Sequence, residues 1–130
     1  MLICGVQYDD AEGAIRWLQD ALGFEPTMTV PGQDGRAVAH AELRRGEDTW
    51  LMVGTTRPPG DPYAGDVPYL VVDDLDAAFA QARAAGAEVV EEIRQETYGR
   101  FFAVRDPQGR VWSVGDYRPA AGGDAAPGSV

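Results

Sequence analysis

Residues 8–26 read YDDAEGAIRWLQDALGFEP, and residues 71–90 read VVDDLDAAFAQARAAGAEVV. Each stretch leaves an apolar segment, passes through paired aspartates and enters a helix-like pattern that a glycine closes. Aspartate is a preferred residue at a helix N-terminus, and glycine is preferred just after a helix C-terminus. We therefore predict two helices, one capped by Asp9 and closed by Gly23, the other capped by Asp73 and closed by Gly86.

The segments around the two helices repeat as well. The paired aspartates recur at an offset of 64 residues, the closing glycines at 63, and Trp50 and Trp112 at 62. Two βαβββ units in tandem account for these coincidences better than an ordinary α+β domain with accidental similarity. The strands are expected at 2–8, 24–30, 36–44 and 49–54, and again at 67–72, 88–93, 99–105 and 110–117.

The chain of 130 residues is long enough for one domain with its own core. We expect a single domain over residues 1–118, made of module one (1–54), a linker rich in proline and glycine (55–66) and module two (67–118). Residues 119–130 lack hydrophobic periodicity, so we expect a disordered tail there.

The net charge is −10, from 21 acidic and 11 basic residues. This balance argues against nucleic-acid binding, which needs a basic face, and is compatible with a cationic ligand. All of the basic residues are arginines, so Schiff-base chemistry through a lysine is excluded. Neither a membrane-spanning run of 18 apolar residues nor a signal-peptide pattern is expected in this sequence.

The chain holds one cysteine, Cys4, and one histidine, His40. A single cysteine cannot form an intrachain disulfide, which fits a reducing, cytoplasmic setting. A single histidine excludes any metal site that takes two histidines from one chain.

Two further stretches carry a resemblance to a known family. They are AVAHAELRRGEDTWLMVG, residues 37–54, and YGRFFAVRDPQGRVWSVGDY, residues 98–117. Together with the two helical stretches they resemble the vicinal oxygen chelate superfamily of glyoxalase and bleomycin-resistance proteins. The resemblance implies an α+β fold in which two tandem βαβββ modules form paired curved sheets around a cup, with the helices outside and often with a homodimeric assembly.

The resemblance also implies where a divalent metal would bind. Enzymes of this superfamily take ligands from the first and last strand of each module, and the matching positions here are Ile3, Leu51, Val67 and Ser113. Hydrocarbon cannot ligate a metal, and a lone hydroxyl is a poor ligand. We therefore expect no metal and no other cofactor at this site.

Strand alternation predicts which side chains line the cup. The result is a mostly apolar surface with a few polar groups, which is the profile of a small-molecule pocket. Tyr69 and Phe102 offer the largest surfaces for stacking on a planar ligand. The predicted ligand-binding residues are Gln7, His40, Glu42, Tyr69, Arg100, Phe102 and Ser113.

Several of these residues allow more than one interpretation. His40 and Glu42 form either an acid–base pair or a polar ladder at the rim of the cup. Arg100 binds either an anionic group of the ligand or Glu42 across the cup. Ser113 with His40 and Glu42 resembles a hydrolytic triad, but VWSVG lacks the strained turn that exposes a nucleophilic serine.

The leading functional hypothesis is a metal-free protein that binds a small organic molecule, sequestering a cationic or aromatic, antibiotic-like ligand without chemistry. One alternative is a metal-dependent lyase, isomerase or dioxygenase with a displaced site around His40 and Glu42. A metal-free epimerase or isomerase that uses one of these two residues as a base is another. A module that binds a protein partner has only Trp17 in its favour.

Overall fold

The computed structural model describes residues 1–33 and 37–119. Within these ranges the predicted strands and helices are present, while the predicted start of a strand at Arg36 and the predicted tail over 120–130 lie outside the described residues. The elements are β1 (Leu2–Tyr8), α1 (Ala11–Leu22), β2 (Glu25–Pro31), β3 (Val38–Arg45), β4 (Thr49–Thr55), β5 (Val67–Val71), α2 (Leu75–Ala84), β6 (Glu88–Glu96), β7 (Gly99–Arg105) and β8 (Val111–Gly115).

Each helix begins after the second aspartate of its pair, one residue later than predicted. The side chain of Asp10 accepts a hydrogen bond from the backbone N–H of Gly13, and that of Asp74 accepts one from Ala77, both at 3.0 Å. A capping side chain reaches the N–H three residues further on, which sets the cap at these positions. Gly23 ends α1 with a φ of 74°, a left-handed conformation that glycine adopts without strain.

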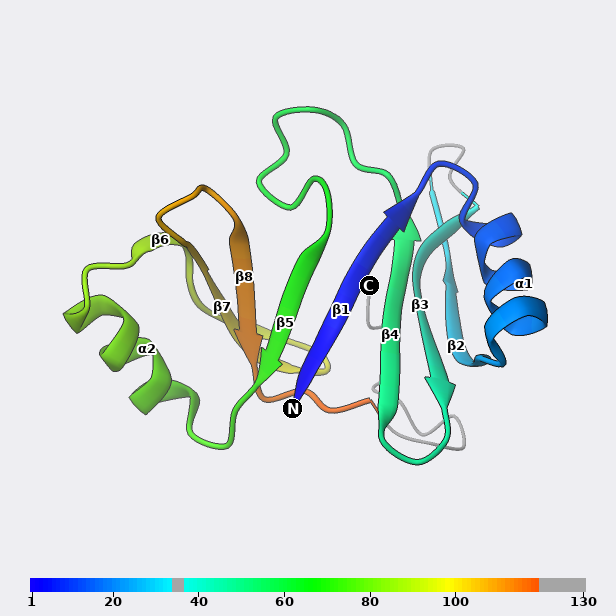
Figure 1. Ribbon diagram of the computed structural model, residues 1–130. Coiled ribbons are helices and arrows are strands. Elements are labelled where there is room, and N and C mark those ends of the chain that lie inside the picture. The colour runs from blue at the N-terminus through cyan, green and yellow to red at the C-terminus, as the bar shows by residue number, and fades with distance from the viewer. Residues whose placement is uncertain (34–36, 120–130) are drawn as a thin grey trace.

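The eight strands form one curved sheet in the order β2-β3-β4-β1-β5-β8-β7-β6 (Figure 1). In each module the first strand pairs in parallel with the last, and the two modules join where β1 and β5 run antiparallel. The helices lie at opposite ends of this sheet, α1 with module one and α2 with module two (Figure 1). The predicted fold class of two tandem βαβββ modules is therefore confirmed.

Two apolar clusters lie between the sheet and its helices. In module one, Ile15 and Leu18 of α1 pack with Leu43 of β3, which is fully buried. In module two, Leu75 of α2 packs with Phe102 of β7. No helix in the described part of the chain is long and apolar enough to cross a membrane.

Candidate functional site

A cavity of about 240 Å³ lies on the face of the sheet that points away from the helices. The cross-strand pair Glu42 and Met52 lines it, while the adjacent pair Leu43 and Leu51 packs under α1. Five of the seven predicted ligand-binding residues line this cavity, namely Gln7, His40, Glu42, Tyr69 and Ser113. It is also lined by residues that were not predicted, among them Met52, Arg57, Tyr63, Tyr98, Phe101 and Tyr117.

The predicted inward orientation of Arg100 and Phe102 is wrong, because both side chains face α2. Phe102 is 1% exposed, and its ring centroid lies 5.0 Å from that of Phe79. The Arg100 guanidinium pairs with Asp76 of α2 at 3.1 Å, so it binds neither Glu42 nor the cavity. Phe101, one residue away, lines the cavity instead.

A change in the repeat offset explains this error. On the cavity face, Glu42 pairs with Met52 in module one and Ala103 pairs with Ser113 in module two, an offset of 61 residues in both strands. The tryptophans suggested an offset of 62, and a slip of one residue moves every side chain of a strand to the other face. For the same reason the counterpart of Ser113 is Met52, not Leu51.

Glu42 is the buried polar centre of the site. Its carboxylate is 0% exposed, lies 3.0 Å from His40 Nε2, and accepts hydrogen bonds of 2.9 and 2.8 Å from the Tyr117 hydroxyl. His40 and Glu42 thus form a close pair, as one of the two sequence interpretations proposed. Among the described residues no hydrogen bond joins Ser113 to His40, so the arrangement is not that of a hydrolytic triad.

Tyrosines from several segments surround this carboxylate. Tyr117 follows β8, and its backbone carbonyl accepts a 2.7 Å hydrogen bond from the Tyr69 hydroxyl. The rings of Tyr98 and Tyr117 meet edge to face, with centroids 5.5 Å apart. The sequence gave no periodic signal for Tyr98 or Tyr117, because both lie at strand ends; a cluster of tyrosines at such ends was the one available clue.

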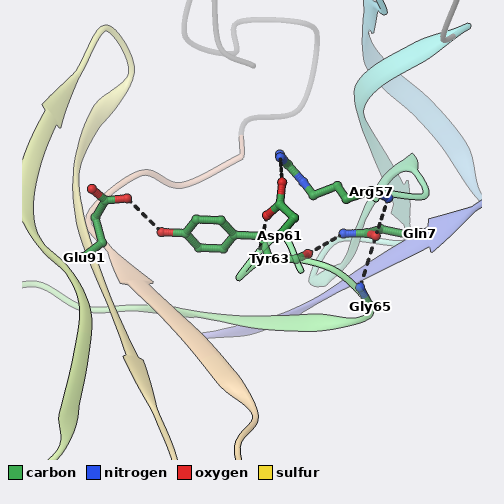
Figure 2. Close-up of polar contacts among 6 residues, drawn as sticks. All are labelled: Gln7, Arg57, Asp61, Tyr63, Gly65 and Glu91. Carbon is green, nitrogen blue, oxygen red and sulfur yellow. Dashed lines mark hydrogen bonds and ion pairs between the residues drawn. The ribbon is translucent and has the colours of Figure 1, made fainter. Parts of the chain in front are cut away.

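The segment predicted as a linker forms a wall of the cavity. Gln7 fixes it: its Nε2 donates to the Tyr63 carbonyl at 2.7 Å, and its Oε1 accepts from the N–H groups of Arg57 and Gly65 at 3.1 and 3.2 Å (Figure 2). The Tyr63 hydroxyl then donates to Glu91 of β6 at 3.0 Å, which ties this segment to module two (Figure 2). Gln7 therefore positions the wall, because its amide is already occupied.

Burial raises the pKa of three cavity tyrosines, Tyr63, Tyr69 and Tyr98. Neighbouring carboxylates raise it further, Glu91 for Tyr63 and Asp116 for Tyr69. These side chains therefore stay neutral phenols at physiological pH and present hydrogen-bond donors and aromatic faces to the cavity.

We expect the protein to lose stability as the pH rises above about 10. A phenol whose pKa is higher in the folded state keeps its proton better there, so its contribution is complete below the unfolded pKa and is lost as the pH rises towards the folded one. Melting temperatures between pH 8 and 11.5 should fall, and the fall should be smaller in a Tyr63→Phe, Tyr69→Phe double variant. Absorbance titration at 295 nm of folded and guanidinium-unfolded protein provides the control; identical titration curves would contradict the assignment.

Comparison with known proteins agrees with the fold and the motifs. A sequence model of the Glyoxalase/Bleomycin resistance protein/Dioxygenase superfamily matches residues 2–114. The chain belongs to this superfamily. An uncharacterised protein of Mycobacterium bovis is 34% identical over 119 residues, which cover 82% of this chain and 76% of that protein.

Solved structures of this superfamily share the architecture. A member from Vibrio splendidus superposes with a TM-score of 0.70 at 16% identity, covering 88% of this chain and 96% of that one. Methylmalonyl-CoA epimerase from Mycobacterium tuberculosis superposes with a TM-score of 0.62 at 22% identity, covering 91% and 86%. At these identities the likeness supports the fold alone.

The metal that the superfamily implies does not fit the residues at the base of the cup. Ile3 is buried, Val67 and Ser113 line the cavity, and Met52 takes the place that we had expected for Leu51. Two hydrocarbons, a thioether and a hydroxyl are weak donors for a divalent metal. Around His40 and Glu42, too, the described part of the chain offers no group of three His, Cys, Asp or Glu side chains. We assign no metal-dependent step to this cavity.

The Asp-Pro-Gln-Gly segment that carries much of the superfamily resemblance has a structural role. The Asp106 carboxylate accepts hydrogen bonds from the N–H groups of Gln108 and Arg110 and from the indole N–H of Trp112, at 3.0, 3.0 and 3.1 Å. These bonds hold the turn between β7 and β8 and thereby set the register that brings Ser113 into the cavity.

Proposed function

We propose that this superfamily member binds a small organic molecule in the cavity without a metal, and that the ligand is cationic and aromatic, as an antibiotic-like molecule would be. One observation carries the proposal. The buried Glu42 carboxylate has, among the described residues, an imidazole and a phenol as its partners and no arginine. The protein would then act by sequestering its ligand.

A buried carboxylate favours a cationic ligand for a physical reason. Removing an ionised group from water costs several kcal/mol unless an opposite charge and hydrogen bonds offset it. Tyr117 and His40 supply hydrogen bonds, and a ligand cation beside Glu42 would supply the charge. The net charge of −10 would also attract cations from a distance.

The walls of the cavity suit an aromatic cation. Tyr69, Tyr98, Phe101 and Tyr117 all line it. Aromatic faces stack on flat ligands and attract cations through the negative potential above the ring. The combination of ring faces and a single buried carboxylate supports a ligand in which a basic group adjoins a flat one.

A second candidate is a metal-free enzyme that uses Glu42 or His40 as a general base. Their separation of 3.0 Å favours it, because an imidazole and a carboxylate in contact can share and transfer a proton. Mass spectrometry of the ligand after incubation separates the two candidates. An altered ligand would replace sequestration with catalysis.

We also propose that the protein works as a cytoplasmic homodimer. The single cysteine supports a reducing compartment. Leu2 and Leu70 pair across β1 and β5 on the outer face and remain exposed, as does Trp17 of α1. Large exposed apolar side chains of this kind favour contact with another subunit.

A thermal-shift screen tests the binding proposal. The panel should hold basic aromatic antibiotics, bleomycin-like compounds included, alongside divalent metal ions. A ligand at 100 times its dissociation constant adds about 2.7 kcal/mol, which should raise the melting temperature of a domain of this size by roughly 3–6 °C. Shifts with organic cations and none with metals are expected. A shift with metals alone would contradict the proposal and favour an enzyme with a displaced metal site.

A further inference from the structure

We propose that Arg57 forms an anion-binding subsite at the end of the cavity remote from Glu42, so that the ligand is a zwitterion. Its cationic group would lie at Glu42, and a carboxylate or a similar anionic oxygen group would lie at Arg57. This inference rests on the proposed function and names the class of molecule that the same cavity takes.

Arg57 is the one arginine among the described residues that line the cavity. Its backbone N–H donates to Gln7, its guanidinium lies over the ring of Tyr63 at 5.9 Å, and its Nη1 pairs with Asp61 at 3.4 Å (Figure 2). Asp61 is itself fixed, because it accepts a 2.8 Å hydrogen bond from the Tyr63 N–H. The guanidinium is thus oriented before any ligand arrives.

The guanidinium has capacity left for a ligand. An arginine side chain carries five N–H donors, and in the described part of the chain the Arg57 side chain makes one hydrogen bond, to Asp61. At 3.4 Å this bond is longer than a typical charged hydrogen bond, and 42% of the side chain is exposed. A carboxylate could therefore bind in bidentate fashion beside Asp61 or displace it.

The two charged groups lie at different levels of the cavity. Glu42 pairs with Met52 on β4, and the chain then climbs through Thr55, where β4 ends, to Arg57. At about 3.3 Å per strand residue, Met52 and Thr55 are roughly 10 Å apart. The lining between the two ends is largely apolar, with Met52, Val67 and Phe101.

The overall charge explains why we infer a zwitterion and not a simple anion. A protein of net charge −10 repels anions at long range. A molecule with one charge of each sign avoids this repulsion and satisfies both ends of the cavity. An extended tripeptide spans about 10 Å and has such a charge distribution.

The test compares two probes that differ in one charge, the tripeptide Gly-Phe-Gly and its C-terminal amide, by NMR titration. Wild-type protein should bind the acid about tenfold more tightly than the amide. Arg57→Gln should reduce the affinity for the acid to that for the amide and leave the amide unchanged. Arg16→Gln, a change at an exposed arginine of α1, should alter neither affinity.

A second variant separates charge from loosened structure. Asp61→Asn keeps an oxygen to accept from the Tyr63 N–H but removes the competing charge, so the acid should bind about threefold more tightly. Weaker binding of the acid in both variants would overturn the Arg57 subsite. Equal affinities of acid and amide for the wild type, both lost in Glu42→Gln, would overturn this inference alone. Failure of both probes to bind would overturn it together with the Glu42 cation site.

Discussion

Replacement of Phe102 by alanine should lower the free energy of unfolding by about 3–5 kcal/mol, as for other fully buried aromatic residues. Phe102 is 1% exposed and lies in the cluster under α2, in contact with Phe79. Because folded domains are stable by only about 5–15 kcal/mol, this loss is large. Urea denaturation of the purified variant measures it.

The adjacent Phe101 provides a matched control. It lines the cavity and is partly exposed, so Phe101→Ala should cost about 1–2 kcal/mol of stability and should weaken ligand binding more than Phe102→Ala does. The two variants remove the same side chain from opposite faces of one strand. The reverse pattern, with Phe101 the more important for stability, would show that the orientation of β7 is wrong.

Replacement of Glu42 by glutamine should abolish most binding of a cationic ligand while the protein stays folded. Loss of a buried charge partner costs about 2–4 kcal/mol of affinity, which is on the order of 30- to 1000-fold. The amide keeps the size of the side chain and an oxygen that accepts from the Tyr117 hydroxyl. Stability should be unchanged or higher, since a buried carboxylate is costly. Calorimetric titration with the strongest cation from the thermal-shift screen measures the affinity.

Tyr117→Phe is the control for this experiment, because it removes one hydrogen bond and keeps the negative charge. The affinity for the cation should then change by less than about tenfold. If Glu42→Gln instead destabilised the protein by several kcal/mol and left the affinity intact, Glu42 would be a structural residue. The binding proposal would then lose the observation that carries it.

The helices and the repeat could be predicted because their signals are local. Asp10 caps a helix through an N–H three residues away, and Gly23 ends the same helix through its own backbone conformation. Neither depends on distant parts of the chain, and the second module repeats the pattern. The eight strands followed from alternation and turn residues in the same way.

The face of a strand depends on register, and register depends on the length of every connection. Between the first and last strands of the modules the repeat offset changes from 64 to 61 residues, as the pairs of Gly5 with Met52 and of Tyr69 with Ser113 show. An odd change reverses the face. Alternation within β7 alone therefore could not decide between Phe101 and Phe102.

The sequence by itself determined the tandem βαβββ fold, the superfamily, the absence of lysine chemistry and the mismatch with the usual metal ligands. Tertiary structure alone decided the composition of the site. Tyr117 reaches Glu42 from 75 positions away, and Gln7 holds the Tyr63 carbonyl from 56 positions away. Such contacts join segments without periodic patterns, so their partners are set by the packing of the two modules and not by any short stretch of sequence.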